Sequence, residues 1–260
     1  GAPGFVKFFD PYVYREKIKF DSEKAAADYY VAKLREQIIY EGPDSVAAIV
    51  VETITGSNGV IIPPEGYLKG VRAVCDEFGI MMICDEVMAG WGRTGKMFAF
   101  EHHGLKPDIV TVAKGLGGGL PISAVLARGD VANAFAVGDH GSTLSGNQLA
   151  CAAATVVVDK LKNGLIDEVA EKGEYLAGKL AYFRKYKFVK DVKGLGLLQS
   201  VELGDGLNGN YIAAQLMQAG ILVNITKYNV IRLLPPYTIE KSEIDDFCAK
   251  LDDIFAKTNL

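Results

Sequence analysis

The sequence of 260 residues predicts an α/β fold with a mostly parallel central sheet. Short apolar runs at residues 46–52, 80–86 and 108–114 have the composition of strands buried on both faces of a sheet. A fourth strand is expected at 123–128. A segment with helical spacing lies between the first two runs, and strands that alternate with helices indicate strand–helix–strand units with parallel pairing.

The helix between the first two strands is expected within residues 64–79. Its apolar side chains recur at helical spacing and are Leu68, Val71, Val74, Cys75 and Phe78. Pro64 suits the first turn of a helix, and Gly79 is placed to end it.

The sequence pattern changes near residue 160. An alanine-rich segment at 147–161 predicts one helix, and residues 166–186 predict another. Short strands follow within 188–203, 221–225 and 230–234, with helices near 210–219 and 241–257. We therefore expect residues 1–160 to belong to a large domain and residues 161–260 to form a smaller C-terminal α/β domain.

Composition excludes several classes of protein. The 28 basic and 32 acidic residues are mixed along the chain, with no basic block that would bind nucleic acid. Four cysteines without a CxxC pair indicate reduced thiols, with neither a disulfide framework nor a metal site. The longest apolar run, 149–158, is shorter than the ~18 residues that span a bilayer. Without a signal peptide at the N-terminus, these features predict a cytoplasmic protein.

Three of the expected strands end in charged residues, which are Glu52, Asp85 together with Glu86, and Lys114. Because the carboxyl ends of parallel strands meet at one edge of a sheet, these side chains are expected to converge there. Ligands of α/β proteins bind at this edge, so it is the expected site.

Lys114 and Asp85 have residue types that suit an aldehyde cofactor with a pyridine ring. Burial beside apolar strands would favour the neutral Lys114 amine, which condenses with an aldehyde. Four of the next five residues are glycines, which would let the backbone approach a bulky ligand. The Asp85 carboxylate would pair with a protonated pyridine nitrogen. Val87, two residues along an extended backbone, would pack on the ring face.

The glycine-rich segment that precedes the helix at 147–161 carries hydroxyls that would bind a phosphate group. Ser142 and Thr143 lie there, close to free backbone amides of a helix N-terminus. Together with Lys114 and Asp85 they describe a site for pyridoxal 5′-phosphate. A nucleotide phosphate loop does not fit, because its glycines precede the lysine.

Each of these residues also has a simple structural interpretation. Lys114 would then be a solvated loop residue, and Asp85 a turn or helix cap. The hydroxyls of Ser142 and Thr143 would only mark the start of a helix. The joint occurrence of the residues at strand ends favours the site.

The motifs that contain these residues resemble those of class III pyridoxal-phosphate-dependent aminotransferases of fold type I. The segments that carry the resemblance are VVETITGSNGVIIPPEGYLKGVR (50–72), CDEVMAGWGRTGKMFAFEHHGLKPDIVTVAKGLGGGLP (84–121), GSTLSGNQLACAAA (141–154), VKGLGLLQSVEL (192–203) and VIRLLPPYT (230–238). The resemblance covers nearly the whole chain from about residue 40. It implies that the N-terminal part of the family's large domain is missing from this sequence.

The resemblance assigns a role to each candidate residue. Lys114 would bind the cofactor aldehyde and move the proton between the substrate Cα and the cofactor, while Asp85 would pair with the ring nitrogen and Val87 would stack on the ring. Thr143 would bind the cofactor phosphate of the neighbouring subunit, which implies a homodimer with shared sites. In the small domain, Arg232 matches the arginine that binds a substrate carboxylate. Glu52 matches an acidic residue that shapes the pocket.

Two residues depart from the common pattern of the family. Ser57 stands where ornithine-type enzymes have a glutamate that masks the arginine, and Met88 replaces a glutamine near the cofactor. The motifs around both residues are more similar to those of the ω-amino acid and taurine:pyruvate branch.

The resemblance implies an aminotransferase that moves an amino group from a small, ω-type amino donor to a keto acid by a ping-pong mechanism. Two alternatives stay open at this point. An aminomutase or decarboxylase of the same fold would use the same cofactor, because the pocket decides which bond breaks. A non-catalytic chain would need a partner to complete its site.

Overall fold

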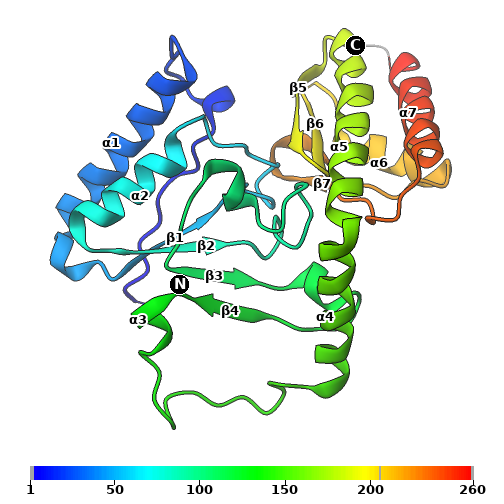
Figure 1. Ribbon diagram of the computed structural model, residues 1–260. Helices are drawn as coiled ribbons and strands as arrows, with labels where there is room; N and C mark the ends of the chain where they lie inside the picture. The colour runs from blue at the N-terminus through cyan, green and yellow to red at the C-terminus, as the bar shows by residue number, and fades with distance from the viewer. Residues whose placement is uncertain (1–2, 205, 259–260) are drawn as a thin grey trace.

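The computed structural model describes residues 3–204 and 206–258 and contains two four-stranded sheets (Figure 1). The first sheet has the order β1 (Ala48–Glu52), β2 (Met81–Asp85), β3 (Ile109–Val112) and β4 (Ala124–Ala127). β1, β2 and β3 are parallel, and β4 is antiparallel to β3. The prediction of an α/β fold with a mostly parallel sheet is therefore confirmed, with all four strands in their expected segments.

Helices α1 (Glu23–Glu41) and α2 (Tyr67–Phe78) pack together on one face of this sheet (Figure 1). Gly79 ends α2 in a left-handed conformation, as expected. Pro64 does not lie in the first turn, because Gly66 is the N-cap and the helix begins at Tyr67. The sequence pattern does not predict α1, whose buried face includes the small residues Ala26 and Ala27 and therefore gives a weak apolar period.

The second sheet is antiparallel throughout and is built from the C-terminal part of the chain. Its order is β5 (Val189–Leu195), β6 (Leu198–Leu203), β8 (Val230–Leu233) and β7 (Asn224–Thr226), with helices α5 (Ile166–Ala181), α6 (Gly209–Gln218) and α7 (Lys241–Ala256). A core of apolar side chains from this sheet and these helices includes Leu180, Phe183, Val201, Ile231 and Phe255. The expected helices of this region are present, and the strand expected at 221–225 is shifted to β7 at Asn224–Thr226.

A bent helical connection joins the two parts of the chain. α4 (Gln148–Lys160) runs into a short π-helical segment (Leu161–Leu165) and then into α5. Asn163 and Gly164 have non-helical backbone angles there, which bend the connection. Because this bend follows residue 160 directly, we propose that residues 1–160 and 161–260 are separate domains.

The remaining helical elements are short. They are α3 (Gly129–Ala132), the 3₁₀ turns η1 (Val13–Arg15), η2 (Pro43–Ser45), η3 (Ala99–His103), η4 (Lys114–Gly117), η6 (Tyr182–Lys185) and η7 (Lys227–Asn229). None of the helices in the described part of the chain has the length and apolar character needed to span a membrane.

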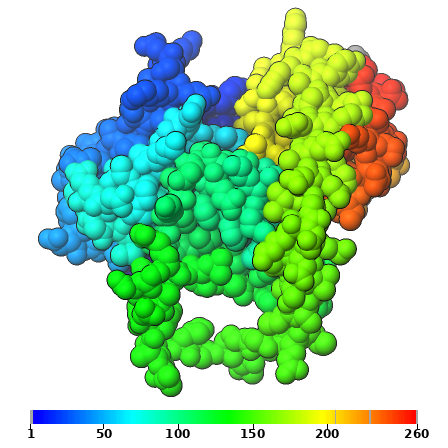
Figure 2. All heavy atoms as spheres, in the orientation of Figure 1, coloured from blue at the N-terminus to red at the C-terminus, as the bar shows by residue number. Residues whose placement is uncertain are grey.

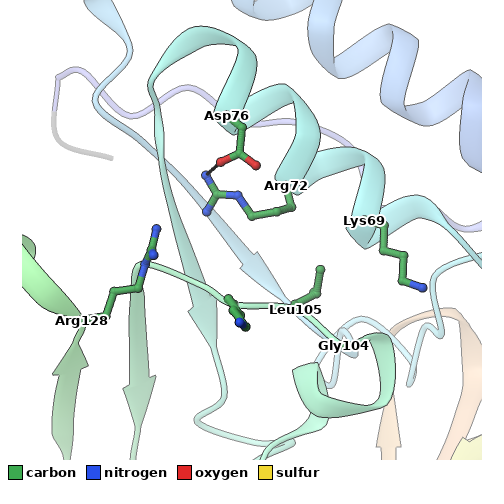
Figure 3. A pocket seen from close by; sticks show the side chains of 7 residues that line it. Lys69, Arg72, Asp76, Gly104, Leu105 and Arg128 are labelled. Carbon is green, nitrogen blue, oxygen red and sulfur yellow. Dashed lines mark ion pairs between the residues drawn. The ribbon is translucent and has the colours of Figure 1, made fainter.

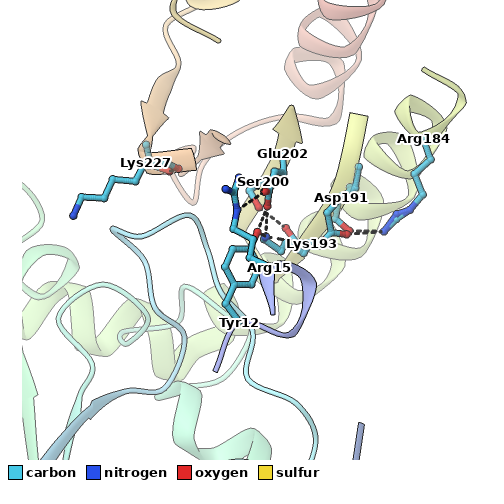
Figure 4. Close-up of polar contacts among 10 residues, drawn as sticks. Tyr12, Arg15, Arg184, Asp191, Lys193, Ser200, Glu202 and Lys227 are labelled. Carbon is cyan, nitrogen blue, oxygen red and sulfur yellow. Dashed lines mark hydrogen bonds and ion pairs between the residues drawn. The ribbon is translucent and has the colours of Figure 1, made fainter. Parts of the chain in front are cut away.

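The N-terminal segment is bound to the second sheet through a buried carboxylate, Glu202 of β6 (Figure 4). Arg15 Nη2 lies 2.6 Å and Lys193 Nζ 2.8 Å from its oxygens, and the Tyr12 hydroxyl also donates to it. Burial lowers the pKa of Lys193 to about 8, against the opposing effect of Asp191. These contacts connect residues far apart in the sequence and hold the start of the chain against the second sheet.

A second buried carboxylate, Asp108, joins three elements at the edge of the first sheet where the parallel strands begin. It directly precedes β3. It accepts from Met82 N at 2.7 Å, from Arg72 Nη1 of α2 at 2.6 Å and from Arg128 Nε at 3.0 Å. Both arginines line an open pocket of about 460 Å³ with Lys69, Asp76, Gly104, Leu105 and Lys106 (Figure 3). Burial alone would raise the pKa of Asp108, but the amide and the two guanidinium groups lower it to about 2.

The substitution Asp108→Asn is expected to destabilise the chain by about 3 kcal/mol at pH 7, because it leaves two arginines without their buried partner. The carboxylate stabilises the fold above its ordinary pKa of 3.8, and this contribution disappears as pH falls towards 2. Urea unfolding of both proteins at pH 7 and pH 3 measures the difference.

The difference between the two proteins should be smaller at pH 3. The control is Asp76→Asn, which removes an exposed partner of Arg72 and should cost less than about 1 kcal/mol. An equal loss for both variants at pH 7 would contradict the role of Asp108.

Candidate functional site

Glu52, Asp85 and Lys114 meet at the carboxyl edge of the first sheet. Glu52 and Asp85 are direct partners in the register of β1 and β2, and Lys114 follows the end of β3 by two residues. Burial raises the pKa of Glu52; the Asp85 carboxylate raises it further, while Lys114 lowers it. The convergence predicted from the strand ends is therefore confirmed.

Lys114 lies on a turn that follows the strand. It is the first residue of η4, has a positive φ of 47° and is exposed. The expected burial is therefore wrong, because β3 ends at Val112 and the lysine extends past the sheet. A non-glycine residue with positive φ is uncommon, and backbone strain of this kind clusters at active sites and ligand-binding segments.

The glycines after Lys114 pack against the chain's own side chains. A Cβ at Gly117 would lie 2.9 Å from Ile122, and one at Gly118 would lie 3.0 Å from Val157 of α4. The expectation that they leave room for a ligand is not met at these two positions. Gly118 lets η4 approach α4 closely, and Gly117 leaves room for Ile122.

Asp85 presents one free carboxylate oxygen at the sheet edge. The side chain is half-buried, and its Oδ1 accepts from Val87 N at 2.9 Å. Within the described residues no donor contacts Oδ2. Val87 lies in a turn, so the extended backbone that was expected to align it with Asp85 ends at Asp85 itself.

Glu86, which was expected at the same strand end as Asp85 but was assigned no role, is a buried residue of the site. Its carboxylate accepts from Thr53 Oγ1 at 2.6 Å, Ala99 N at 2.8 Å and Phe100 N at 2.9 Å. Burial raises its pKa, and these three hydrogen bonds oppose the shift. Because Thr53 follows Glu52 and Glu86 follows Asp85, the bonds fix both strand ends. The signal in the sequence was an acidic residue directly after Asp85 in an apolar context.

Arg232 of β8 reaches the same edge from the second sheet. Its Nη1 donates to Gly56 O at 3.2 Å and lies 3.6 Å from Met88 Sδ. Gly56 N in turn donates to Glu52 at 2.8 Å. Burial lowers the pKa of Arg232, while Glu52 opposes this. Arg232 Nε is buried without a hydrogen-bond partner, as expected of a group that awaits an acceptor.

Ser142 and Thr143 lie away from this edge, on an arm between α3 and α4. The arm comprises residues 133–147, and Figure 2 shows an opening between it and the body. Both hydroxyl residues are exposed, and within the described residues no contact joins either to Lys114 or Asp85. The N-cap of α4 is Asn147, so the hydroxyls precede the helix by several residues.

Comparison with known proteins gives a match to the family model for class-III aminotransferases over residues 3–255. The acetylornithine aminotransferase of Methanocaldococcus jannaschii is 45% identical over 82% of this chain and 54% of its own length. That of Aquifex aeolicus is 40% identical over 98% of this chain and 63% of its own length. The chain thus spans roughly half to two thirds of these curated relatives.

Solved structures give the same result. Taurine:2-oxoglutarate aminotransferase from Bifidobacterium kashiwanohense, in complex with PLP and glutamate, aligns with a TM-score of 0.91 and 37% identity over 98% of this chain and 61% of its own. An omega transaminase from Pseudomonas jessenii in complex with PMP aligns with a TM-score of 0.91 and 29% identity over 99% and 62% of the two chains. The fold is therefore that of fold type I transaminases, and both the ornithine and the ω branches occur among the relatives.

Glu86→Ala is expected to destabilise the chain by about 3 kcal/mol, because it leaves a hydroxyl and two buried amides without an acceptor. Urea unfolding measures the loss. The control Glu101→Ala removes an exposed neighbour and should change the free energy of unfolding by less than about 0.5 kcal/mol. A loss below about 1 kcal/mol for Glu86→Ala would show that its hydrogen bonds do not hold the strand ends.

Proposed function

Because the chain belongs to the class III aminotransferase family, we propose that it transfers an amino group from a small amino donor to a keto acid, with pyridoxal 5′-phosphate as its cofactor. What supports this proposal is the position of both Lys114 and Asp85 at the carboxyl edge of the first sheet, which Arg232 reaches from the second sheet. Structural relatives bound to PLP with glutamate, or to PMP, support the choice of cofactor.

The side chains present at the edge fit this cofactor. Lys114 offers an exposed amine to the aldehyde, and the free oxygen of Asp85 offers an acceptor to a protonated ring nitrogen. The half-buried guanidinium of Arg232, which no carboxylate of the described residues pairs with, offers donors to a substrate carboxylate. These are the three contacts that a pyridine aldehyde and an amino acid require.

The bound cofactor supplies an aldehyde that captures an amine and a cationic ring that accepts electrons. Lys114 would hold the cofactor at its aldehyde carbon, and its amine would move the proton at the substrate Cα. Asp85 would keep the ring nitrogen protonated through a charge-assisted hydrogen bond. The keto product of the donor leaves before the acceptor binds, which gives ping-pong kinetics.

Arg232 selects substrates with a carboxylate. Its planar guanidinium suits two-point binding, and Glu52 positions it indirectly through the loop at Gly56. No carboxylate of the described residues forms an ion pair with Arg232, so its charge is available to the substrate. Ser57 stands where ornithine-type enzymes have the masking glutamate, which supports a small ω-amino acid as donor.

We further propose a homodimer in which the arm at 133–147 contacts the second copy. Phe135 is 73% exposed and Leu144 79% exposed, and Leu149 at the start of α4 is also exposed. Large apolar side chains on an arm that stands off the body indicate a covered surface in the assembled protein. Ser142 and Thr143 lie on this arm, so a second copy would bring hydroxyls to the cofactor phosphate.

After unbound pyridoxal 5′-phosphate is removed by gel filtration, the purified chain is expected to stay yellow and to lose the colour on borohydride reduction, whereas Lys114→Ala should elute colourless. Absorption spectroscopy measures this, and Lys106→Ala is the control, since Lys106 lies at the opposite edge of the sheet. Colour that persists in Lys114→Ala would assign the aldehyde to another amine.

Formation of alanine from pyruvate with an amino donor would demonstrate transfer. Rearranged donor, or released carbon dioxide, would instead indicate the aminomutase or decarboxylase alternative. A wild-type chain that stays colourless would support the alternative of a chain that requires a partner.

The double variant Phe135→Asp, Leu144→Asp is expected to shift the chain from dimer to monomer, because two charges cannot be buried unpaired in an apolar interface. Sedimentation at several protein concentrations measures the mass. The control Tyr182→Asp changes another exposed ring outside the arm and should leave the dimer intact. A monomeric wild-type chain would contradict the proposed assembly.

A further inference from the structure

Arg93 joins the loop after β2 to the second sheet. Its Nη1 donates to Pro235 O at 2.6 Å and to Leu197 O at 3.2 Å, and its guanidinium lies 4.4 Å from the centre of the Tyr237 ring. Leu197 N also donates to Arg93 O at 3.0 Å. Burial lowers the pKa of Arg93, and Tyr237 opposes this. One arginine thus contacts both the β5–β6 turn and the segment after β8.

Tyr237 follows β8 of the second sheet and contacts the loop after β2 of the first sheet. Its hydroxyl donates to Trp91 O at 2.7 Å, and a Cβ added to Gly115 would lie 3.3 Å from that hydroxyl. Gly115 directly follows Lys114. The tyrosine therefore packs against the turn that carries the reactive lysine.

The same segment is rigidly connected to Arg232. β8 ends at Leu233, and the residues up to Tyr237 include Pro235 and Pro236, whose fixed φ angles stiffen the backbone. Lys172 of α5 donates to Tyr237 O at 3.2 Å and holds the segment from the other side. Tyr237 thus lies four residues after the end of β8, on a segment held at both faces by side-chain contacts.

From these contacts we propose that Arg93 and Tyr237 are positioning residues that set the separation between Arg232 and Lys114. The inference rests on the proposed function, in which Arg232 binds the substrate carboxylate and Lys114 acts at the Cα. Neither residue needs to touch the substrate. They determine whether a carboxylate bound to Arg232 places the amino-bearing carbon within reach of the lysine.

The test is Tyr237→Phe, which keeps the ring beneath Arg93 and removes only the hydroxyl. Hydrogen–deuterium exchange of peptides covering 114–119 and 230–236 measures the coupling without catalysis. We expect exchange to become about five to ten times faster in both peptides, as loss of one buried hydrogen bond allows. The control Tyr175→Phe removes the hydrogen bond to Asp245 at the protein surface and should leave both peptides unchanged.

A kinetic comparison tests the consequence for substrates. β-Alanine carries a carboxylate, and n-propylamine has the same length without one. Tyr237→Phe and Arg93→Lys are expected to raise the KM for β-alanine about tenfold while changing the rate with n-propylamine less than twofold. Loss of folding would lower the rates with both amines, so the split between them identifies positioning.

The outcomes separate this inference from the proposed function. Unchanged exchange in both peptides of Tyr237→Phe, or an equal rise of KM for both amines, would overturn the inference while transfer itself remained. Absence of any amino transfer by the wild-type chain would overturn the proposed function, and the exchange measurement would still decide whether Tyr237 couples the two segments.

Discussion

The parallel, in-register pairing of β1, β2 and β3 determines where every candidate residue of the site lies. Glu52 and Asp85 are paired at the strand ends, and Lys114 follows the third strand at the same edge. A shift of one residue in this register would turn the side chains to the opposite face. The buried Glu86 accepts hydrogen bonds from Thr53 and Ala99, which lie beside these strand ends. These bonds stabilise the register at the candidate site.

A binding site at the edge of one sheet also needs residues that face this edge, and the second sheet contributes them. Arg232 reaches Gly56, which is itself bound to Glu52, so the carboxylate-binding group and the first sheet share one hydrogen-bonded loop. The contacts of Arg93 and Tyr237 also connect the first sheet to the second. An apolar cluster in which Ile54 and Val60 pack with Leu198 of β6 spans the junction between the two sheets. The polar contacts beside it are directional and set orientation as well as distance.

Features encoded by local pattern were predictable from the sequence, and features made by tertiary contact were not. Apolar β-branched runs such as 46–52 predict buried strands, and parallel topology then brings Glu52 and Asp85 together. The exposure of Lys114 was not predictable, because it depends on where β3 ends. The role of Glu86 depends on amides at Ala99 and Phe100, which approach it only after the chain folds.

The most direct measurement is a crystal structure of the chain with pyridoxal 5′-phosphate bound. The account requires the cofactor ring nitrogen within about 2.6–3.2 Å of an Asp85 oxygen, the hydrogen-bond range. It also requires the aldehyde carbon of the same cofactor molecule to be bonded to Lys114 Nζ. A cofactor bound elsewhere, or a ring that reaches only one of these two residues, would contradict the claim that the strand ends of the first sheet form one active site.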